Sequence, residues 1–197
     1  MQNNNFIIGI TGGSGCGKTT ALDVIRQMGG LVLDCDAIYH RLLQEDLQLL
    51  AAIEERFPGV VENGVLQRKK LGNIVFSDEN ALFDLNKITH SAVKAEVQRL
   101  LASHKGLAAI DAIGLFEGDL AGLCQMTVAI CAPEEARIAR LMAREGISEE
   151  YARKRIAAQR SDAQFRKMCD YVLENDENRE SFQAKCLAFF SQHCIIK

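Results

Sequence analysis

Residues 12–19, with the sequence GGSGCGKT, constrain the fold of this 197-residue chain more than any other stretch. They match the pattern G-x-x-x-x-G-K-[ST] at every fixed position, an apolar run (6–10) precedes them, and a helical pattern (19–28) follows. Glycines let backbone N–H groups point inward around phosphate oxygens, and the N-terminus of the next helix adds a favourable dipole. A loop that only makes a tight turn does not require the Lys-Thr pair. The stretch therefore predicts a nucleoside triphosphate site.

The motif also predicts roles for individual residues. Lys18 is expected to reach the β- and γ-phosphates, and the Thr19 hydroxyl is expected to bind Mg²⁺. ATP and Mg²⁺ are the expected cofactors. The predicted nucleotide-binding residues are Gly13, Ser14, Gly15, Cys16, Gly17, Lys18, Thr19 and Thr20 of the loop, together with Arg140.

Short apolar runs alternate with longer helical patterns along the whole chain. Continuous runs rich in Ile, Val and Leu are typical of strands that are buried on both faces of a parallel sheet. We predict strands at 6–10, 31–33, 107–113, 126–131 and 171–173, and helices at 19–28, 134–145 and 179–192. This alternation, with the phosphate loop, predicts an α/β fold of the P-loop NTPase type: a doubly wound, five-stranded parallel sheet.

The interval between the second and third predicted strands is much longer than one crossover helix requires. It contains two helical patterns, at 40–57 and 80–104, separated by Pro-Gly and Asn-Gly turn signals within 58–72. We predict a mostly helical insertion over 37–106, at the edge of the sheet, that binds the acceptor substrate.

Arginines gather in the segment 134–167. Arg137, Arg140 and Arg144 share one helical face, Gly146 then interrupts the pattern, and a cap at Ser148 begins a second helix. An arginine-rich hairpin suits a lid over transferring phosphates, and Arg140 and Arg144 are its predicted catalytic contacts. A solvated hairpin held by salt bridges to its own glutamates is the alternative. The chain is then one domain, with a core at 1–36, 107–133 and 168–197, the insertion, and the lid.

Bulk properties exclude several other classes of protein. The formal net charge of −3 provides no global basic field for nucleic acid or an anionic membrane, and no apolar run approaches the roughly 20 residues of a membrane span. The first residues lack the basic and apolar regions of a signal peptide. Seven scattered cysteines without a CxxC motif indicate reduced, mostly buried thiols in a cytoplasmic protein. The sequence indicates no particular oligomeric state.

A switch-type GTPase is a competing interpretation of the phosphate loop. Asp111 to Gly114 fits the D-x-x-G element of such proteins. However, the guanine-reading N-K-x-D is absent, because the only Asn-Lys pair (86–89, NKIT) has Thr where Asp is required. Together with the arginine-rich lid, this favours a kinase that acts on a small molecule.

Two aspartates, Asp34 and Asp36, follow the second apolar run directly. If the strand continues through them, both carboxylates face one side, since side chains two apart in a strand point the same way. Residues at the carboxyl end of this strand lie beside the phosphate loop, where such sheets bind ligands. Asp111 also ends a buried strand, where it would serve either Mg²⁺ or a structural hydrogen bond.

Several elements resemble, in the same order, those of the dephospho-coenzyme A kinase family. LDCDAIYHR resembles the family's D-A-D-x-x-x-R segment, and LFEGDL resembles the end of its P-L-L-F-E element. ARLMAREGISEEYARKRIAAQ resembles its arginine-rich lid, and CDYVLEN resembles its A-D-Y-x-I-x-N segment. The resemblance covers nearly the whole chain, with Ser91 and Ile113 at positions where the family has proline.

This resemblance implies transfer of the ATP γ-phosphoryl group to the ribose 3′-hydroxyl of dephospho-coenzyme A, the last step of coenzyme A biosynthesis. Asp36 is expected to orient the hydroxyl and accept its proton, alongside Lys18 and the lid arginines. The implied substrate-binding residues are Asp36, Arg41, His90, Glu117, Arg155 and Gln159, and the implied metal-site residues are Thr19, Asp34 and Asp111. Two other functions stay open: a kinase of another nucleoside or nucleotide, and a non-catalytic nucleotide-binding regulator.

Overall fold

A five-stranded parallel sheet forms the centre of the molecule, in a computed structural model that describes residues 5–194. The strand order β2-β5-β1-β6-β7 places β1 in the middle, so the chain winds outward first to one side and then to the other. The strands are β1 (Asn5–Thr11), β2 (Leu31–Asp34), β5 (Gly106–Asp111), β6 (Met126–Cys131) and β7 (Tyr171–Glu174). All five predicted strands are confirmed, as is the doubly wound parallel fold.

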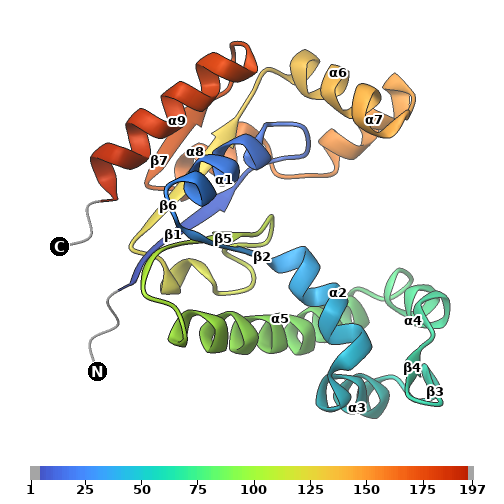
Figure 1. The fold of residues 1–197 in the computed structure, drawn as a ribbon. Helices are drawn as coiled ribbons and strands as arrows, with labels where there is room; N and C mark the ends of the chain where they lie inside the picture. Colours follow the sequence, from blue (N-terminus) through green and yellow to red (C-terminus); the bar gives the residue numbers. More distant parts are fainter. Residues whose placement is uncertain (1–4, 195–197) are drawn as a thin grey trace.

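Helices cover both faces of this sheet (Figure 1). One face packs against α1 (Lys18–Gln27) and α9 (Arg179–His193), and the other packs against α5 (Glu79–Ala102) and α8 (Asp162–Met168). Side chains of a strand alternate between the two layers. In β1, for example, Ile7 faces the α5 layer, whereas Ile8 and Ile10 face the α1 layer. Burial on both faces explains why the strands are continuously apolar.

The insertion follows the edge strand β2 and is mostly helical, as predicted. Its elements are α2 (Cys35–Glu45), α3 (Leu47–Arg56), the hairpin β3 (Val61–Glu62) and β4 (Val65–Leu66), α4 (Arg68–Val75) and α5. The single helix predicted over 40–57 is wrong, because the chain breaks at Asp46. The carboxylate of Asp46 accepts hydrogen bonds from the N–H groups of Gln48 and Leu49, at 2.9 and 3.0 Å, and so begins a new helix.

The arginine-rich segment forms a helical hairpin of α6 (Glu134–Glu145) and α7 (Glu149–Ala157). Gly146 ends α6 with a positive φ of 67°, and the Ser148 hydroxyl caps α7, as predicted. In Figure 1 this hairpin and the insertion extend from the same end of the sheet, one above and one below the phosphate loop. A short 3₁₀ turn (Ala121–Leu123) precedes β6. No helix among residues 5–194 is long and apolar enough to cross a membrane.

Candidate active site

The phosphate loop connects the end of β1 to the start of α1, at the carboxyl edge of the sheet. Gly17 has a φ of 103°, a left-handed conformation that suits glycine, and α1 begins at Lys18. Lys18 Nζ donates a hydrogen bond to the Gly12 carbonyl at 2.9 Å, while Thr19 is exposed. Cys16 is buried, and burial raises the pKa of its thiol, so this side chain is uncharged at neutral pH. The loop therefore presents a helix N-terminus and a lysine at one place.

The two aspartates after the second strand do not share one face of a strand. The prediction of continued strand geometry is wrong because β2 ends at Asp34, which caps α2 by accepting a hydrogen bond from Ala37 N at 2.9 Å. Asp36 lies in the first turn of α2 and is exposed. An acidic residue at this position is favourable, since the helix N-terminus carries a partial positive charge. The two carboxylates thus differ in their local surroundings.

Asp111 lies directly beside Asp34, as its register partner on the neighbouring strand β5. Its Oδ1 atom is buried and lacks a hydrogen-bond partner among the described residues. Burial raises the pKa of Asp111 to about 6; the Lys18 ammonium opposes this rise, and the charges of Asp34 and Asp36 add to it. A buried carboxylate oxygen without a partner is unusual in a folded protein, so this atom points to a missing cationic or donor group.

The residues present fit a Mg²⁺ ion that is bound together with a nucleotide. Within residues 5–194, no group of three or more His, Cys, Asp or Glu side chains is arranged to hold a metal ion by itself. Mg²⁺, however, is commonly held by one or two carboxylates together with substrate phosphates and water. Asp34 and Asp111 supply two carboxylates at adjacent strand ends, and Thr19 supplies a hydroxyl at the start of α1.

The predicted lid arginines lie in two different environments. Arg140 donates from its NH1 atom to the Gly15 carbonyl at 3.2 Å, so it contacts the phosphate loop. Arg144 and Arg155 both bind Glu145 instead, each at 2.5 Å. Arg153 binds three glutamates of the hairpin, so salt bridges of the alternative interpretation are present too. Roles for Arg144 and Arg155 toward a ligand stay predictions.

Gln159 contacts the phosphate loop at Ser14. Its Oε1 atom accepts from Ser14 N, and its Nε2 atom donates to Ser14 Oγ, both at 2.8 Å. Two further residues that the sequence reasoning did not select also reach the loop. Arg137 donates from Nε to the Ser14 carbonyl at 2.9 Å, and Asn175 donates from Nδ2 to the Cys16 carbonyl at 2.8 Å. The available signal for Asn175 was the resemblance of CDYVLEN to the family's A-D-Y-x-I-x-N segment, in which it is the last residue.

A cavity of about 220 Å³ lies between α2, α5 and the loop after β5. Its walls include Asp36, Tyr39, Asn86, Thr89 and His90. A second, open hollow of about 660 Å³ shares Asn86 and His90 with this cavity, so the two adjoin along α5. The predicted residues Asp36 and His90 therefore face one space.

Arg41 and Glu117, also predicted to bind substrate, are occupied by protein partners. Arg41 forms an ion pair with Glu96 of α5. Glu117 lines the larger hollow and accepts a hydrogen bond from Arg160 Nε at 2.7 Å. Arg160 follows α7, so Glu117 connects the loop after β5 to the base of the lid. The ligand contacts of both residues stay predictions.

Comparisons with known proteins agree with this arrangement. A family model described as Dephospho-CoA kinase matches residues 6–181. The dephospho-CoA kinase of Mesorhizobium japonicum is 33% identical over 191 residues, which cover 95% of this chain and 96% of that protein. The crystal structure of the Thermus thermophilus protein TT1252 has a TM-score of 0.79 at 33% identity, covering 95% of this chain and 97% of that one. Dephospho-CoA kinase from Campylobacter jejuni, at 24% identity, TM-score 0.67 and coverage of 96% and 98%, supports the fold alone. The chain belongs to the dephospho-CoA kinase family.

Proposed function

We propose that this protein transfers the γ-phosphoryl group of ATP to the ribose 3′-hydroxyl of dephospho-coenzyme A, giving coenzyme A and ADP. The observation that carries the proposal is the position of Asp36. This carboxylate lies on the wall of the cavity between α2 and α5, two residues from the strand end where Asp34 and Asp111 adjoin. A phosphate loop, a metal-binding edge and an acceptor cavity with an exposed base are the parts that a small-molecule kinase requires.

Asp36 orients the acceptor hydroxyl toward the γ-phosphate and accepts its proton as the new bond forms. Its carboxylate lies in the first turn of α2, where the helix dipole is favourable to an acidic side chain. In phosphoryl transfer, positioning and charge stabilisation contribute more than base strength. The main task of Asp36 is therefore to hold the hydroxyl in line.

Lys18 and the lid arginines neutralise charge on the transferred group. Lys18 Nζ now donates to the Gly12 carbonyl, and a phosphate oxygen would take the place of that carbonyl. Thr19, Asp34 and Asp111 would hold Mg²⁺, directly or through water, and the ion would neutralise charge on the β- and γ-phosphates. Arg144 and Arg155 exchange their shared partner Glu145 for phosphate oxygens when the lid closes.

The acceptor occupies the two adjoining spaces along α5. Its ribose lies against Asp36 and His90 in the smaller cavity, and the remainder extends into the larger hollow. Lys87 and Lys94 line that hollow, and Lys94 would exchange its partner Asp119 for the acceptor's diphosphate, while Phe83 supplies an apolar surface. The free thiols of all seven cysteines favour the reducing cytoplasm as the compartment.

An acceptor panel tests the proposal. ATP, Mg²⁺ and the protein are combined with dephospho-coenzyme A, adenosine, AMP or no acceptor, ADP release is followed by a coupled assay, and the product is identified by mass spectrometry. We expect turnover with dephospho-coenzyme A alone, and none with the Lys18→Ala variant. Preferred turnover with adenosine or AMP would support another nucleoside or nucleotide kinase. ATP binding without ADP release from any acceptor would support a regulator.

A further inference from the structure

We propose that Arg137 and Asn175 are positioning residues that hold the phosphate loop in its anion-binding conformation before the nucleotide arrives. The inference rests on the proposed function, since it assumes a nucleotide at this loop. Neither side chain is assigned a direct contact with ATP. Their action is on the loop backbone.

Side chains of α6, and of the residue that follows β7, donate hydrogen bonds to the loop carbonyls. Arg137 Nε donates to the Ser14 carbonyl at 2.9 Å, and Asn175 Nδ2 donates to the Cys16 carbonyl at 2.8 Å. Arg140 donates to the Gly15 carbonyl between them, at 3.2 Å. Three consecutive carbonyl oxygens of the loop therefore each accept from a side chain that is more than 100 positions distant in sequence.

When a loop carbonyl points outward, to a side chain outside the loop, the N–H of the next residue points inward, to the phosphate-binding side. A peptide unit is planar and trans, so its C=O and N–H bonds point in opposite directions. The contact of Arg137 with the Ser14 carbonyl therefore directs the N–H of Gly15 away from Arg137. In the same way, the contact of Asn175 with the Cys16 carbonyl directs the N–H of Gly17 away from Asn175. Within the described residues, these two N–H groups have no protein acceptor. They remain available for phosphate oxygens.

Two loop glycines are required because these side chains come so close. A Cβ atom on Gly13 would lie 2.1 Å from Arg137 NH2, and one on Gly17 would lie 2.1 Å from Asn175 Nδ2. Both distances are far below van der Waals contact. The glycine pattern of the motif thus serves the contacts from outside as well as the approach of phosphate from inside.

Burial and partners fix both side chains in place. Arg137 is 4% exposed and also contacts Asp162 Oδ1 at 3.3 Å and Gln159 Oε1 at 3.5 Å. Asn175 is 5% exposed, and its own N–H donates to the Cys131 carbonyl at 2.8 Å. Buried, multiply bonded side chains hold a nearby backbone rigidly, and donors that are prearranged for an anion need no reorganisation when it binds.

Substitution with apolar side chains of similar size tests the inference. In Arg137→Met and Asn175→Leu, calorimetry would measure the Kd of Mg·ADP and of pyrophosphate, and NMR titration would measure that of adenosine. We expect the Kd of both phosphate ligands to rise about tenfold, as for the loss of one good hydrogen bond to the loop, with adenosine binding unchanged. The KM for ATP should rise while that for the acceptor stays the same.

Arg153→Met is the matched control. It removes one positive charge from the same hairpin, but its partners are Glu134, Glu135 and Glu149, not the loop. We expect its Mg·ADP affinity to stay within twofold. Arg137→Lys keeps the charge, so a tenfold loss in that variant as well would support a positional role rather than an electrostatic one.

Equal losses for adenosine and pyrophosphate in Asn175→Leu would overturn the inference, since they would indicate general damage to the fold. Unchanged pyrophosphate affinity in both variants would overturn it too. If Arg137→Met does not fold, Asn175→Leu and Arg137→Lys still decide the question. Failure of dephospho-coenzyme A as acceptor would contradict the proposed function and leave these binding results valid. Absence of Mg·ADP binding by the unchanged protein would remove both.

Discussion

Asp36 is an exposed carboxylate in the first turn of α2, and it lines the cavity between α2 and α5. We predict that Asp36→Asn lowers kcat by about 10²-fold or more, because the amide cannot accept the hydroxyl proton. Mg·ADP affinity should be unchanged, since Asp36 lies on the acceptor side. Steady-state kinetics and calorimetry measure the two quantities.

A charge-matched control separates this effect from a change in net charge. Asp84→Asn also removes one negative charge from the insertion, but Asp84 pairs with Arg56 outside the acceptor cavity. Its kcat should remain near that of the unchanged protein. A near-native kcat in Asp36→Asn would contradict the assignment of the base.

Asp111 should make the unfolding free energy of the protein depend on pH when EDTA is present and nucleotide is absent. Its pKa is raised to about 6, mainly by burial, from an ordinary value of 3.8. Between these values the native state binds more protons than the unfolded state, so stability falls as pH rises from about 4 to 6. Asp111→Asn lacks this loss and should gain up to about 3 kcal/mol relative to the unchanged protein over that range.

Urea unfolding at pH 4, 5, 6 and 7 measures the difference between the two proteins. The gain should be small at pH 4 and nearly complete at pH 7. Parallel stability curves would contradict a raised pKa at this position. In the kinase assay the same variant should show a higher Mg²⁺ requirement, because one of the two strand-end carboxylates has lost its charge.

Asp34 caps α2, and in the proposed function it also helps to hold Mg²⁺; substitutions can separate these two roles. Asparagine caps helices about as well as aspartate, whereas alanine does not. We predict that Asp34→Ala loses about 1 kcal/mol of unfolding free energy and that Asp34→Asn loses only a few tenths. Both variants should require more Mg²⁺ for turnover. Equal destabilisation in the two would contradict the capping role seen in the hydrogen bond to Ala37.

At the scale of elements, the sequence predicted what is encoded by contiguous residues. The phosphate loop, the five strands and the break at Gly146 each depend on a local pattern, and the structure confirms them. The boundary at Asp46 was missed because Leu47 continues the apolar pattern of the preceding helix, while the cap chemistry favours a new start. The capping hydrogen bonds of Asp46 therefore outweighed the apolar periodicity and set the boundary between α2 and α3.

The positioning residues of the loop were harder to predict for another reason. Arg137 and Asn175 reach Ser14 and Cys16 across 123 and 159 positions of sequence. Nothing in the periodicity of α6 distinguishes an arginine that turns inward, such as Arg137, from Arg144, which pairs with Glu145. The winding of the sheet, which places β6 next to β1 and β7 next to β6, brings these side chains to the loop.

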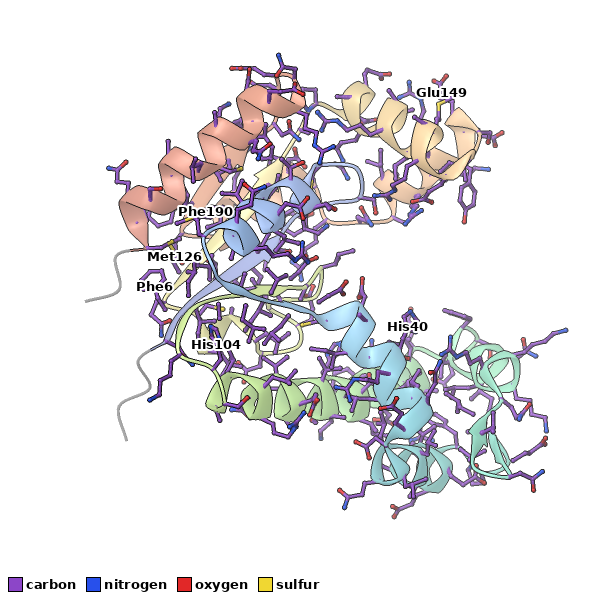
Figure 2. All side chains as sticks on the ribbon, viewed as in Figure 1. Phe6, His40, His104, Met126, Glu149 and Phe190 are labelled. Carbon is purple, nitrogen blue, oxygen red and sulfur yellow. The ribbon has the colours of Figure 1, made fainter. Side chains whose placement is uncertain are left out.

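At the scale of the whole molecule, the layer of α1 and α9 supports the phosphate loop from behind. The apolar face of α9 presents Phe182, Cys186 and Phe190, all fully buried, toward the same core as α1. Phe190 is labelled in Figure 2. Phe182 also lies close to the loop itself, with its ring 3.7 Å from where a Cβ atom of Gly17 would be. Loss of packing in this layer should thus act on stability first.

We predict that Phe190→Ala lowers the free energy of unfolding by about 3–5 kcal/mol, because it leaves a cavity in a core that cannot fully collapse. For a chain of this length, that corresponds to a fall in Tm of about 10 °C. Leu187→Ala is the control on the same helix: its side chain is 48% exposed, so its effect should stay within about 0.5 kcal/mol. Calorimetry measures both.

Since Phe190 lies in the core between α1 and α9 and does not line the cavity at Asp36, kcat per folded molecule should be unchanged at 20 °C. A large fall in kcat without a fall in Tm would show that this layer controls the loop conformation rather than the stability of the fold.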